Sequence, residues 1–325
     1  MDKIAFISGE TIIYWNSIVY TLATAVAICF FLAFYLGHTG NAVAGFAAIP
    51  LSIFLSVVFS RFVHWYSRAD SYLDFTTAMT DYTSGGYALI GAFAGCALAA
   101  VLLRLIFLHR SIGSMLDAMS LAGCAGIAVG RLASLFNASD RGNIVEGIQS
   151  LPFVYPVTNA VSGATEYRLA TFMLQAMVAL VLFVVLTVFY LKGKDKVKEG
   201  DICLIFLLLY CASQVVLDST RYDSLFFRSN GFVSIVQVFS ALGLGLVIAV
   251  FSKRLVNAAG FKVWYIFLWI LLGGCIGGGG FMEYYVQRHG DQAVFAYSVM
   301  TAFLMGIVLL TLLLRLLAAK GEKKP

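Results

Sequence analysis

Apolar stretches of about 20 residues recur along the chain and are separated by short polar segments, the length at which a helix crosses the hydrocarbon core of a bilayer. Reading the apolar windows in this way predicts about nine membrane-spanning helices. Their expected ranges are 12–36, 42–64, 86–108, 114–136, 168–191, 202–219, 232–252, 262–282 and 294–317. The pattern therefore predicts an all-α, polytopic integral membrane protein.

Composition supports this fold class. Of the 325 residues, 61% are hydrophobic and only 12% are charged, with a mean hydropathy of +0.89. Soluble domains average about 25% charged residues, so a soluble globule is excluded. The net charge of +5 comes from basic residues scattered among the loops, without a basic face or interleaved aromatic residues. The sequence therefore predicts membrane lipids as surroundings and no nucleic-acid partner.

The six cysteines all fall inside apolar stretches, and no two have the CxxC spacing. A closed zinc site needs four clustered ligands, and no such cluster is visible, so we expect neither a metal site nor another cofactor. The first apolar stretch follows Asp2, Lys3 and Glu10 without a basic leader. It is expected to be a retained span rather than a signal peptide.

Basic residues indicate the orientation of the chain, because cytoplasmic loops of membrane proteins are enriched in lysine and arginine. Four basic groups each follow an odd-numbered predicted span, whereas acidic residues gather in the opposite connections. The basic groups are Arg104, His109 and Arg110; Lys192, Lys194, Lys196 and Lys198; Lys253, Arg254 and Lys262; and Arg315, Lys320, Lys323 and Lys324. We expect the N-terminus outside the cell and a basic C-terminal tail in the cytoplasm.

Arg131 is the charged residue that the membrane setting makes most informative. It lies within the fourth predicted span and begins a polar string that ends near Asn143. An arginine near the bilayer centre costs about 2.5–3.5 kcal/mol on insertion scales, so such residues usually face a polar site. Arg131 is expected in the outer leaflet, about 9 Å from the end of its span. The long connection that follows, 138–167, is rich in glycine and proline and is expected to form an extracytoplasmic head or lid.

Several short motifs resemble the prolipoprotein diacylglyceryl transferase family of bacterial membrane enzymes. Its Gly-Arg-led signature is matched by Gly130, Arg131, Asn137 and Gly142. A later motif, an aromatic residue, an acid and an arginine three residues after the acid, resembles Tyr210, Asp218 and Arg221, and Gln237 fits the start of the next span. Further counterparts are Arg61, Trp15, Tyr20, Ser240 and the glycine-rich segment 85–91. The resemblance implies a seven-helix core over residues 1–258, with two additional helices and the basic tail over 259–325.

Some positions depart from the family pattern. The histidine of the family that precedes a glycine pair at the opening of the third span corresponds to Gly86, beside Tyr87. The asparagine three residues after the signature arginine corresponds to Ser134, and a basic residue of the sixth span corresponds to Gln214. The acidic residue of the signature corresponds to Ser139, with Asp140 adjacent.

The resemblance implies transfer of the diacylglyceryl group of phosphatidylglycerol to the lipobox cysteine of a prolipoprotein, with a thioether as product and glycerol phosphate as by-product. The acceptor peptide supplies the nucleophile, and the reaction would occur at the outer leaflet of a bacterial plasma membrane. Arg131 and Arg221 are expected to hold the phosphate, because a guanidinium presents a planar charged fork to its oxygens. The residues expected to shape the pocket are Asn137, Ser134, Gly142, Asp218, Arg61, Tyr20 and Gln237. His64 and Tyr87 are the candidates for deprotonating the thiol.

Alternative interpretations of these residues stay open. Arg131 is also compatible with a structural ion pair, and Arg221 with an anchor at the membrane interface. Asn137 and Ser134 fit helix capping, Gly142 fits a turn, and His64 fits an interfacial position. A catalytically silent or repurposed relative that binds anionic phospholipid or a lipoprotein precursor is the alternative function, favoured by the departures from the family pattern.

Overall fold

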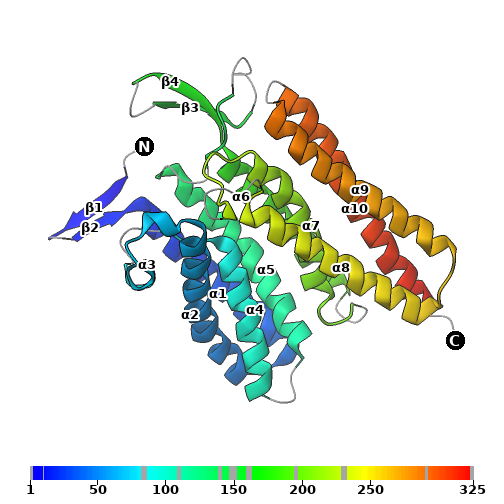
Figure 1. Cartoon of the computed structure of the whole chain (residues 1–325). Helices are drawn as coiled ribbons and strands as arrows, with labels where there is room; N and C mark the ends of the chain where they lie inside the picture. Colours follow the sequence, from blue (N-terminus) through cyan, green and yellow to red (C-terminus); the bar gives the residue numbers. More distant parts are fainter. Residues whose placement is uncertain are drawn as a thin grey trace. The chain divides into compact units, whose positions relative to one another are not determined.

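The computed structural model describes residues 3–9, 11–81, 86–107, 111–137, 141–145, 152–158, 163–193, 197–227, 233–289 and 292–322. Within these ranges, nine helices are long and apolar enough to cross a membrane. They are α1 (Trp15–Thr39), α2 (Ala42–Ser67), α4 (Leu89–Ile106), α5 (Ile112–Gly130) with its continuation η2 (Arg131–Leu135), α6 (Thr171–Gly193), α7 (Asp201–Ser219), α8 (Ile235–Ala259), α9 (Trp264–Arg288) and α10 (Ala293–Gly321) (Figure 1). The predicted helical multi-pass membrane protein is confirmed.

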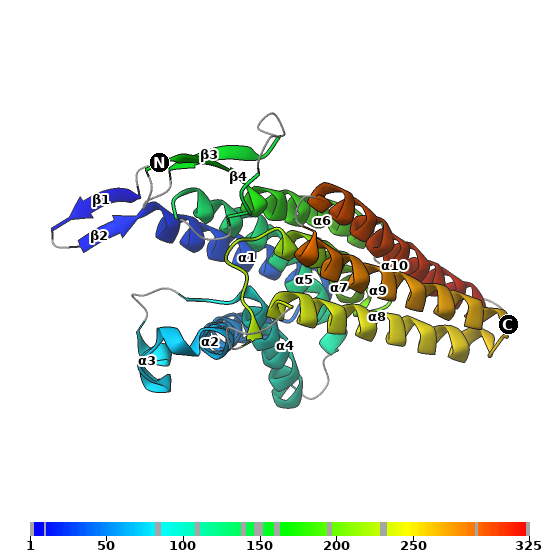
Figure 2. The same ribbon diagram turned by 45° about the horizontal axis from the view of Figure 1, so that its top comes forward.

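Short elements occupy the segments between the spans. Strands β1 (Ile4–Ser8) and β2 (Thr11–Tyr14) form an antiparallel hairpin that leads into α1, as Figure 2 shows. A turn η1 (Ala69–Ser71) and a short helix α3 (Phe75–Thr80) follow α2. Strands β3 (Val154–Thr158) and β4 (Thr165–Leu169) form a second antiparallel hairpin before α6. The predicted head segment therefore contains regular structure, and the first span begins at Trp15 rather than at 12.

The chain forms two compact units. Unit 1 comprises Met1–Phe206 and Thr220–Val236, and unit 2 comprises Leu207–Ser219 and Gln237–Pro325. This division differs from the boundary near residue 258 drawn from the sequence, because most of α7 and α8 groups with α9 and α10. Whether residues 1–258 act as the functional core stays a prediction.

Small residues allow the helices of unit 1 to pack closely. The pairs α2 with α4 and α1 with α5 make the most extensive contacts. A Cβ atom at Gly95 would lie 2.5 Å from the carbonyl of Leu55, and one at Gly126 would lie 3.0 Å from the Cβ of Ala27. Helix pairs in lipid gain most from such close approach, because no hydrophobic effect drives them together. Gly95 thus lets α4 pack closely on α2, and Gly126 lets α5, the helix that leads to Arg131, pack closely on α1.

Several polar segments meet at one end of unit 1, called the head end below. Ser60 near the end of α2 donates its hydroxyl to the carbonyl of Ala88 at the start of α4, over 2.8 Å. Trp15 at the start of α1 stacks on Phe136 just beyond η2, with ring centroids 5.8 Å apart. The head end thus holds the beginnings of α1, α4 and α6 and the ends of α2 and α5.

Unit 2 is held by packing and by a few polar contacts. Gln237 at the start of its α8 portion donates to the carbonyl of Val215 in α7, over 3.2 Å. Trp269 of α9 donates to the hydroxyl of Ser252 in α8, over 3.1 Å. The hydroxyl of Tyr297 in α10 donates to the carbonyl of Ser219 at the end of α7, over 3.1 Å. These bonds link the appended helices to α7 and α8.

Candidate functional site

Arg131 lies where the fourth span changes its helical geometry. Helix α5 ends at Gly130, and the chain continues as the 3-10 helix η2, with the backbone N–H of Arg131 directed to the carbonyls of Ile127 and Val129. Gly130 lies against α1, where a Cβ would be 3.5 Å from that of Ala23. Arg131 is half-buried, and Ser134 one turn further is buried. The Gly-Arg pair thus combines close helix packing with a guanidinium at the head end.

Gly142, the last residue of the signature, pairs with Arg221 through an isolated antiparallel bridge. On either side of it, Asn143 N–H donates to the carbonyl of Thr220 over 2.9 Å, and Tyr222 N–H donates to that of Arg141 over 2.9 Å. The N–H of Gly142 itself donates to the carbonyl of Leu169, over 2.8 Å. The structure therefore brings the signature string and the later arginine motif together through their backbones.

Glycine is required at position 142 by the close approach of its neighbours. A Cβ atom there would lie 2.6 Å from the Cβ of Leu169, 2.7 Å from its carbonyl oxygen and 2.7 Å from the hydroxyl of Thr171. Two of those atoms belong to Leu169, whose backbone is held by hydrogen bonds to Gly142 and Asn143, so they have little room to move. This crowding is a physical reason to expect that Gly142 shapes the site. The need for a turn alone would not explain it.

Arg221 is held by a carboxylate. Its Nε and Nη2 donate to Oδ1 of Asp223 over 3.1 and 2.9 Å, and its side chain is 11% exposed. The carboxylate fixes the orientation of the guanidinium and competes for donors that a phosphate would use. Asp218, which the sequence associates with this arginine, is buried in α7 within unit 2, so its role stays a prediction. Gln237 belongs to unit 2 as well.

Two further arginines lie beside Gly142, and the sequence interpretation did not assign them a role. Arg168 in β4 forms an ion pair with Glu166 at 2.8 Å and donates to the carbonyl of Gly142 over 3.4 Å. Arg141 donates to the carbonyl of Asn137, over 3.2 Å. Strand alternation puts Glu166 and Arg168 on one side of β4, so this pair was detectable from the sequence. The head end therefore contains more guanidinium groups than the two of Arg131 and Arg221 that the sequence predicted.

Tyr155 in β3 belongs to this group of arginines. Burial raises the pKa of Tyr155 above its usual value, while the positive charges of Arg141 and Arg168 oppose the rise. The guanidinium of Arg168 also lies 4.7 Å from the ring centroid of Tyr222. The β3–β4 hairpin therefore contributes aromatic and cationic side chains next to the signature string. Ser139 and Asp140 of that string lie outside the described residues.

A second group at the head end contains Arg61, His64 and Tyr87, which the sequence singled out. Arg61 is 1% exposed, and its guanidinium donates to the carbonyls of Gly86, over 3.4 Å, and of Asp81. That guanidinium lies 5.2 Å from the ring centroid of Tyr87. The Arg61 side chain thus fastens the segment before α4 to the end of α2. Tyr20, in contrast, is 47% exposed on α1.

The crowding around Gly86 explains why this position carries no side chain. Its φ is +84°, and a Cβ atom there would meet the hydroxyl of Tyr72 and lie 2.8 Å from Nδ1 of His64. A side chain at position 86 and the imidazole of His64 therefore exclude one another. The imidazole that lies beside Gly86 belongs to His64 and enters from α2. The preceding Gly85 lies outside the described residues.

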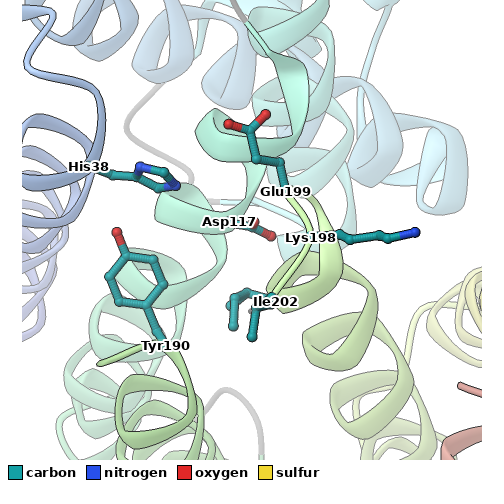
Figure 3. Close-up of a pocket in the computed structure, with 7 residues that line it drawn as sticks. His38, Asp117, Tyr190, Lys198, Glu199 and Ile202 are labelled. Atoms are coloured by element: carbon teal, nitrogen blue, oxygen red, sulfur yellow. The ribbon is translucent and has the colours of Figure 1, made fainter. Parts of the chain in front are cut away.

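A small pocket lies at the opposite end of unit 1, between α1, α5, α6 and the start of α7. Figure 3 shows His38 and Tyr190 directed toward one another beside Asp117. The carboxylate of Asp117 accepts hydrogen bonds from the backbone N–H groups of Gly200 and Cys203, both over 2.7 Å. Such bonds satisfy the otherwise unpaired donors at a helix start. Asp117 thus caps α7. Within the described ranges, no three His, Cys, Asp or Glu side chains gather to hold a metal ion.

Comparison with known proteins gives one consistent result. The family model described as prolipoprotein diacylglyceryl transferase matches residues 3–253. Similar relatives include phosphatidylglycerol–prolipoprotein diacylglyceryl transferases of Streptococcus pneumoniae strains Hungary19A-6, JJA and ATCC 700669 / Spain 23F-1. Each is 25% identical over 206 residues, covering 62% of this chain and 74% of the relative. Both head-end groups lie inside the matched range, and α9 and α10 lie outside it.

Proposed function

Since the chain belongs to the prolipoprotein diacylglyceryl transferase family, we propose that it transfers the diacylglyceryl group of phosphatidylglycerol to the thiol of a prolipoprotein cysteine. The acceptor is a lipobox peptide, the product is a thioether and the by-product is glycerol phosphate. The reaction takes place at the outer face of a bacterial plasma membrane, with the N-terminus outside and the C-terminus in the cytoplasm. The positions of the basic loops support this orientation.

The observation that carries the proposal is the backbone pairing of Gly142 with Arg221. It joins two family motifs that lie about 80 residues apart in the sequence, within one compact unit. Arg141 and Arg168, the latter paired with Glu166, add guanidinium groups beside the same glycine. A site of this character suits a lipid headgroup that carries a phosphate diester, because arginine offers several charged donors to phosphate oxygens.

The reaction requires an attack on carbon with a phosphate as leaving group. The thiolate sulfur forms a bond to the terminal glycerol carbon, and the carbon–oxygen bond to the phosphate breaks. The electron pair remains on the phosphate oxygen, so negative charge grows there. Arg131 and Arg221 are proposed to stabilise that charge, and one such preorganised donor is typically worth about 3–4 kcal/mol. Ser134, Asn137 and Gly142 shape the surroundings, with Tyr20 as a further expected contact.

The thiol must lose a proton before or during the attack. A cysteine thiol with a pKa near 8.5 is a few per cent ionised at about pH 7, so forming the thiolate costs only about 2 kcal/mol. His64 is proposed to accept this proton. Tyr87, next to Arg61, lies in the same group at the head end and is proposed to contact the reacting groups.

The proposal is tested with purified protein, labelled phosphatidylglycerol and a lipobox peptide. The wild type is expected to form a labelled thioether, and Arg131→Ala is expected to lower the rate by about 100-fold or more. Arg288→Ala is the matched control, because Arg288 is an exposed arginine at the end of α9 outside the family match. An inactive wild type, or an Arg131→Ala variant as active as the control, contradicts the proposal.

The ion pair between Arg221 and Asp223 favours a second candidate function. A guanidinium that is already neutralised binds a phosphate less strongly, which suits a relative that recognises anionic phospholipid without transferring it. In that case the protein retains phosphatidylglycerol from mixed vesicles but forms no thioether. Asp223→Asn separates the two functions further: it removes the negative charge that faces the guanidinium and is expected to increase lipid binding in both cases, whereas thioether formation occurs only in a transferase.

A further inference from the structure

Tyr72, a residue without a role in the proposed reaction, lies against His64. The Tyr72 hydroxyl lies 2.8 Å from Nδ1 of His64, and the two rings meet edge to face with centroids 5.9 Å apart. Tyr72 follows η1, whereas His64 lies in the last turn of α2. The chain therefore folds back over eight residues to bring a phenol against the imidazole.

The surroundings keep this pair in one arrangement. The guanidinium of the buried Arg61 lies 5.9 Å from the ring centroid of Tyr72 and holds the carbonyls of Asp81 and Gly86. Gly86 passes so close to the pair that a Cβ atom there would lie 2.8 Å from Nδ1 and 2.9 Å from Cε1 of His64. The imidazole is thus enclosed by the phenol on one side and by glycine backbone on another.

We propose that Tyr72 is a positioning residue, which holds the His64 imidazole in the tautomer and orientation that accept the proton of the acceptor thiol. The inference rests on the proposed diacylglyceryl transfer and names the pair of residues that handles its proton. Gly86 is part of the same arrangement, because its missing side chain leaves the space that the imidazole occupies.

The proposal assigns Nδ1–H of His64 as the donor to the Tyr72 oxygen, and this assignment leaves Nε2 to take the proton. When Nδ1–H donates to the Tyr72 oxygen, the lone pair of the neutral ring resides on Nε2. The thiol proton moves to Nε2, and the sulfur attacks the glycerol carbon as its bond to the phosphate oxygen breaks. Partial burial and the positive charges of Arg68 and Arg61 disfavour the imidazolium, so it gives its proton at once to solvent or to the departing glycerol phosphate, which restores the neutral ring. Atoms and charge balance without a further reactant.

A double-mutant cycle tests the role of Tyr72. His64→Ala is expected to lower kcat by about 30-fold near pH 7, the factor that corresponds to the cost of about 2 kcal/mol for forming the thiolate without a base. Tyr72→Phe keeps the ring against Arg61, removes only the hydroxyl, and is expected to lower kcat by about tenfold with the KM for phosphatidylglycerol unchanged. The double variant should be no slower than His64→Ala alone, because Tyr72 acts through the imidazole. Tyr190→Phe, which removes a hydroxyl directed to the carbonyl of Phe34 at the opposite end of unit 1, is the control.

The pH dependence provides a second readout that a structural role would not produce. The charged and titratable groups around the imidazole are Arg61 and Arg68 of α2, Tyr72, and Tyr87 before α4. Arginine and tyrosine normally keep one charge state below about pH 9.5, whereas the acceptor thiol ionises near pH 8.5. The deficits of His64→Ala and Tyr72→Phe should therefore shrink as the assay pH rises from about 6.5 to 8.5.

The outcomes separate this inference from the function on which it rests. A wild type without thioether product contradicts the proposed transfer itself. An active wild type with Tyr72→Phe equal to Tyr190→Phe overturns the role of Tyr72 alone. Tyr72→Phe that slows the reaction equally in the presence and absence of His64, at every pH, also overturns it and indicates a structural contribution.

Discussion

Glycine residues in two regions of the molecule do different things. In unit 1, Gly86 and Gly142 are crowded, so that an added Cβ would run into neighbouring side-chain or backbone atoms. In α9 of unit 2, the stretch of six glycines from 273 to 280 contains several that are exposed and have no atom within 4 Å of an added Cβ. These are Gly273, Gly274, Gly277 and Gly280. One residue type thus marks close approach in one region and open helix surface in the other.

The difference shows which glycines are candidates for a role in function. A crowded glycine lets two chain segments approach closely, as Gly142 does beside Leu169 and Gly86 does beside His64. An uncrowded glycine on a helix exerts no such constraint within the part of the chain that the structure describes. A glycine-rich string is therefore a weak guide by itself, and the neighbours of each glycine decide its meaning. Substitution by alanine tests this at four positions, from the strongest expected effect to the weakest.

Gly142→Ala should have the largest effect. The new methyl group would lie 2.6–2.7 Å from Leu169 and Thr171, and relief requires a shift of the backbone at residue 142 or 169, which disturbs the bridge between Gly142 and Arg221. We expect a loss of about 2–3 kcal/mol of stability, together with a fall in thioether formation of about 100-fold. Thermal unfolding in detergent and the labelled-lipid assay measure both quantities. A variant with wild-type activity would mean that the Gly142–Arg221 junction does not shape the site.

Gly86→Ala should impair activity more than stability. The residue has a φ of +84°, which costs an alanine about 1–2 kcal/mol, and the atoms in the way are the ends of two side chains. Those side chains can turn aside, but they are Tyr72 and His64. We expect about a tenfold loss of kcat with a modest change in Tm. The comparison fails if Tm falls as far as in Gly142→Ala while kcat stays unchanged.

Gly278→Ala is expected to lower stability only slightly. An added Cβ would lie 2.5 Å from the Phe303 ring of α10, the far end of a flexible side chain. Repacking of one ring in a helix interface costs about 1 kcal/mol. Because α9 lies outside the family match, the transfer rate at a temperature below unfolding should equal that of the wild type. Loss of transfer with intact folding would assign α9 a part in the reaction.

Gly274→Ala should be nearly silent. No atom lies within 4 Å of the added methyl group, and alanine is the better helix former by about 1 kcal/mol. Tm is expected to be unchanged or slightly raised, with full transfer activity. A clear drop in Tm would reveal a contact at this face that only the assembled protein in its membrane makes.

The hydrophobic pattern was sufficient to predict the spans. Length and apolarity determine a membrane helix almost alone, and the nine predicted ranges agree with the nine helices apart from their ends. The start of the first span was placed too early, because Ile12 and Ile13 are apolar although they pair with β1. Strand pairing depends on a distant segment, so an apolar window cannot detect it.

The candidate site was partly predictable. The sequence predicts Arg61, His64 and Tyr87 near the ends of spans on one side of the membrane. The structure brings all three into one group. Tyr72 was missed, since its contact with His64 depends on a fold-back through η1 that carries no strong sequence signal. Arg168 was missed, although its spacing of two residues from Glu166 places both side chains on one face of a strand and could have indicated the ion pair. The ion pair of Arg221 with Asp223 also needed coordinates, because spacing alone does not select between nearby carboxylates.

The six cysteines of the chain have a practical consequence. All are thiols inside the membrane-spanning helices and none forms a disulfide, at positions 29, 96, 124, 203, 211 and 275. A charged maleimide that stays in water would reach the cysteine of a soluble lipobox peptide far sooner than these thiols. The unreacted peptide can therefore be titrated at timed intervals in the presence of the native protein, and the kinetics need no cysteine-free background.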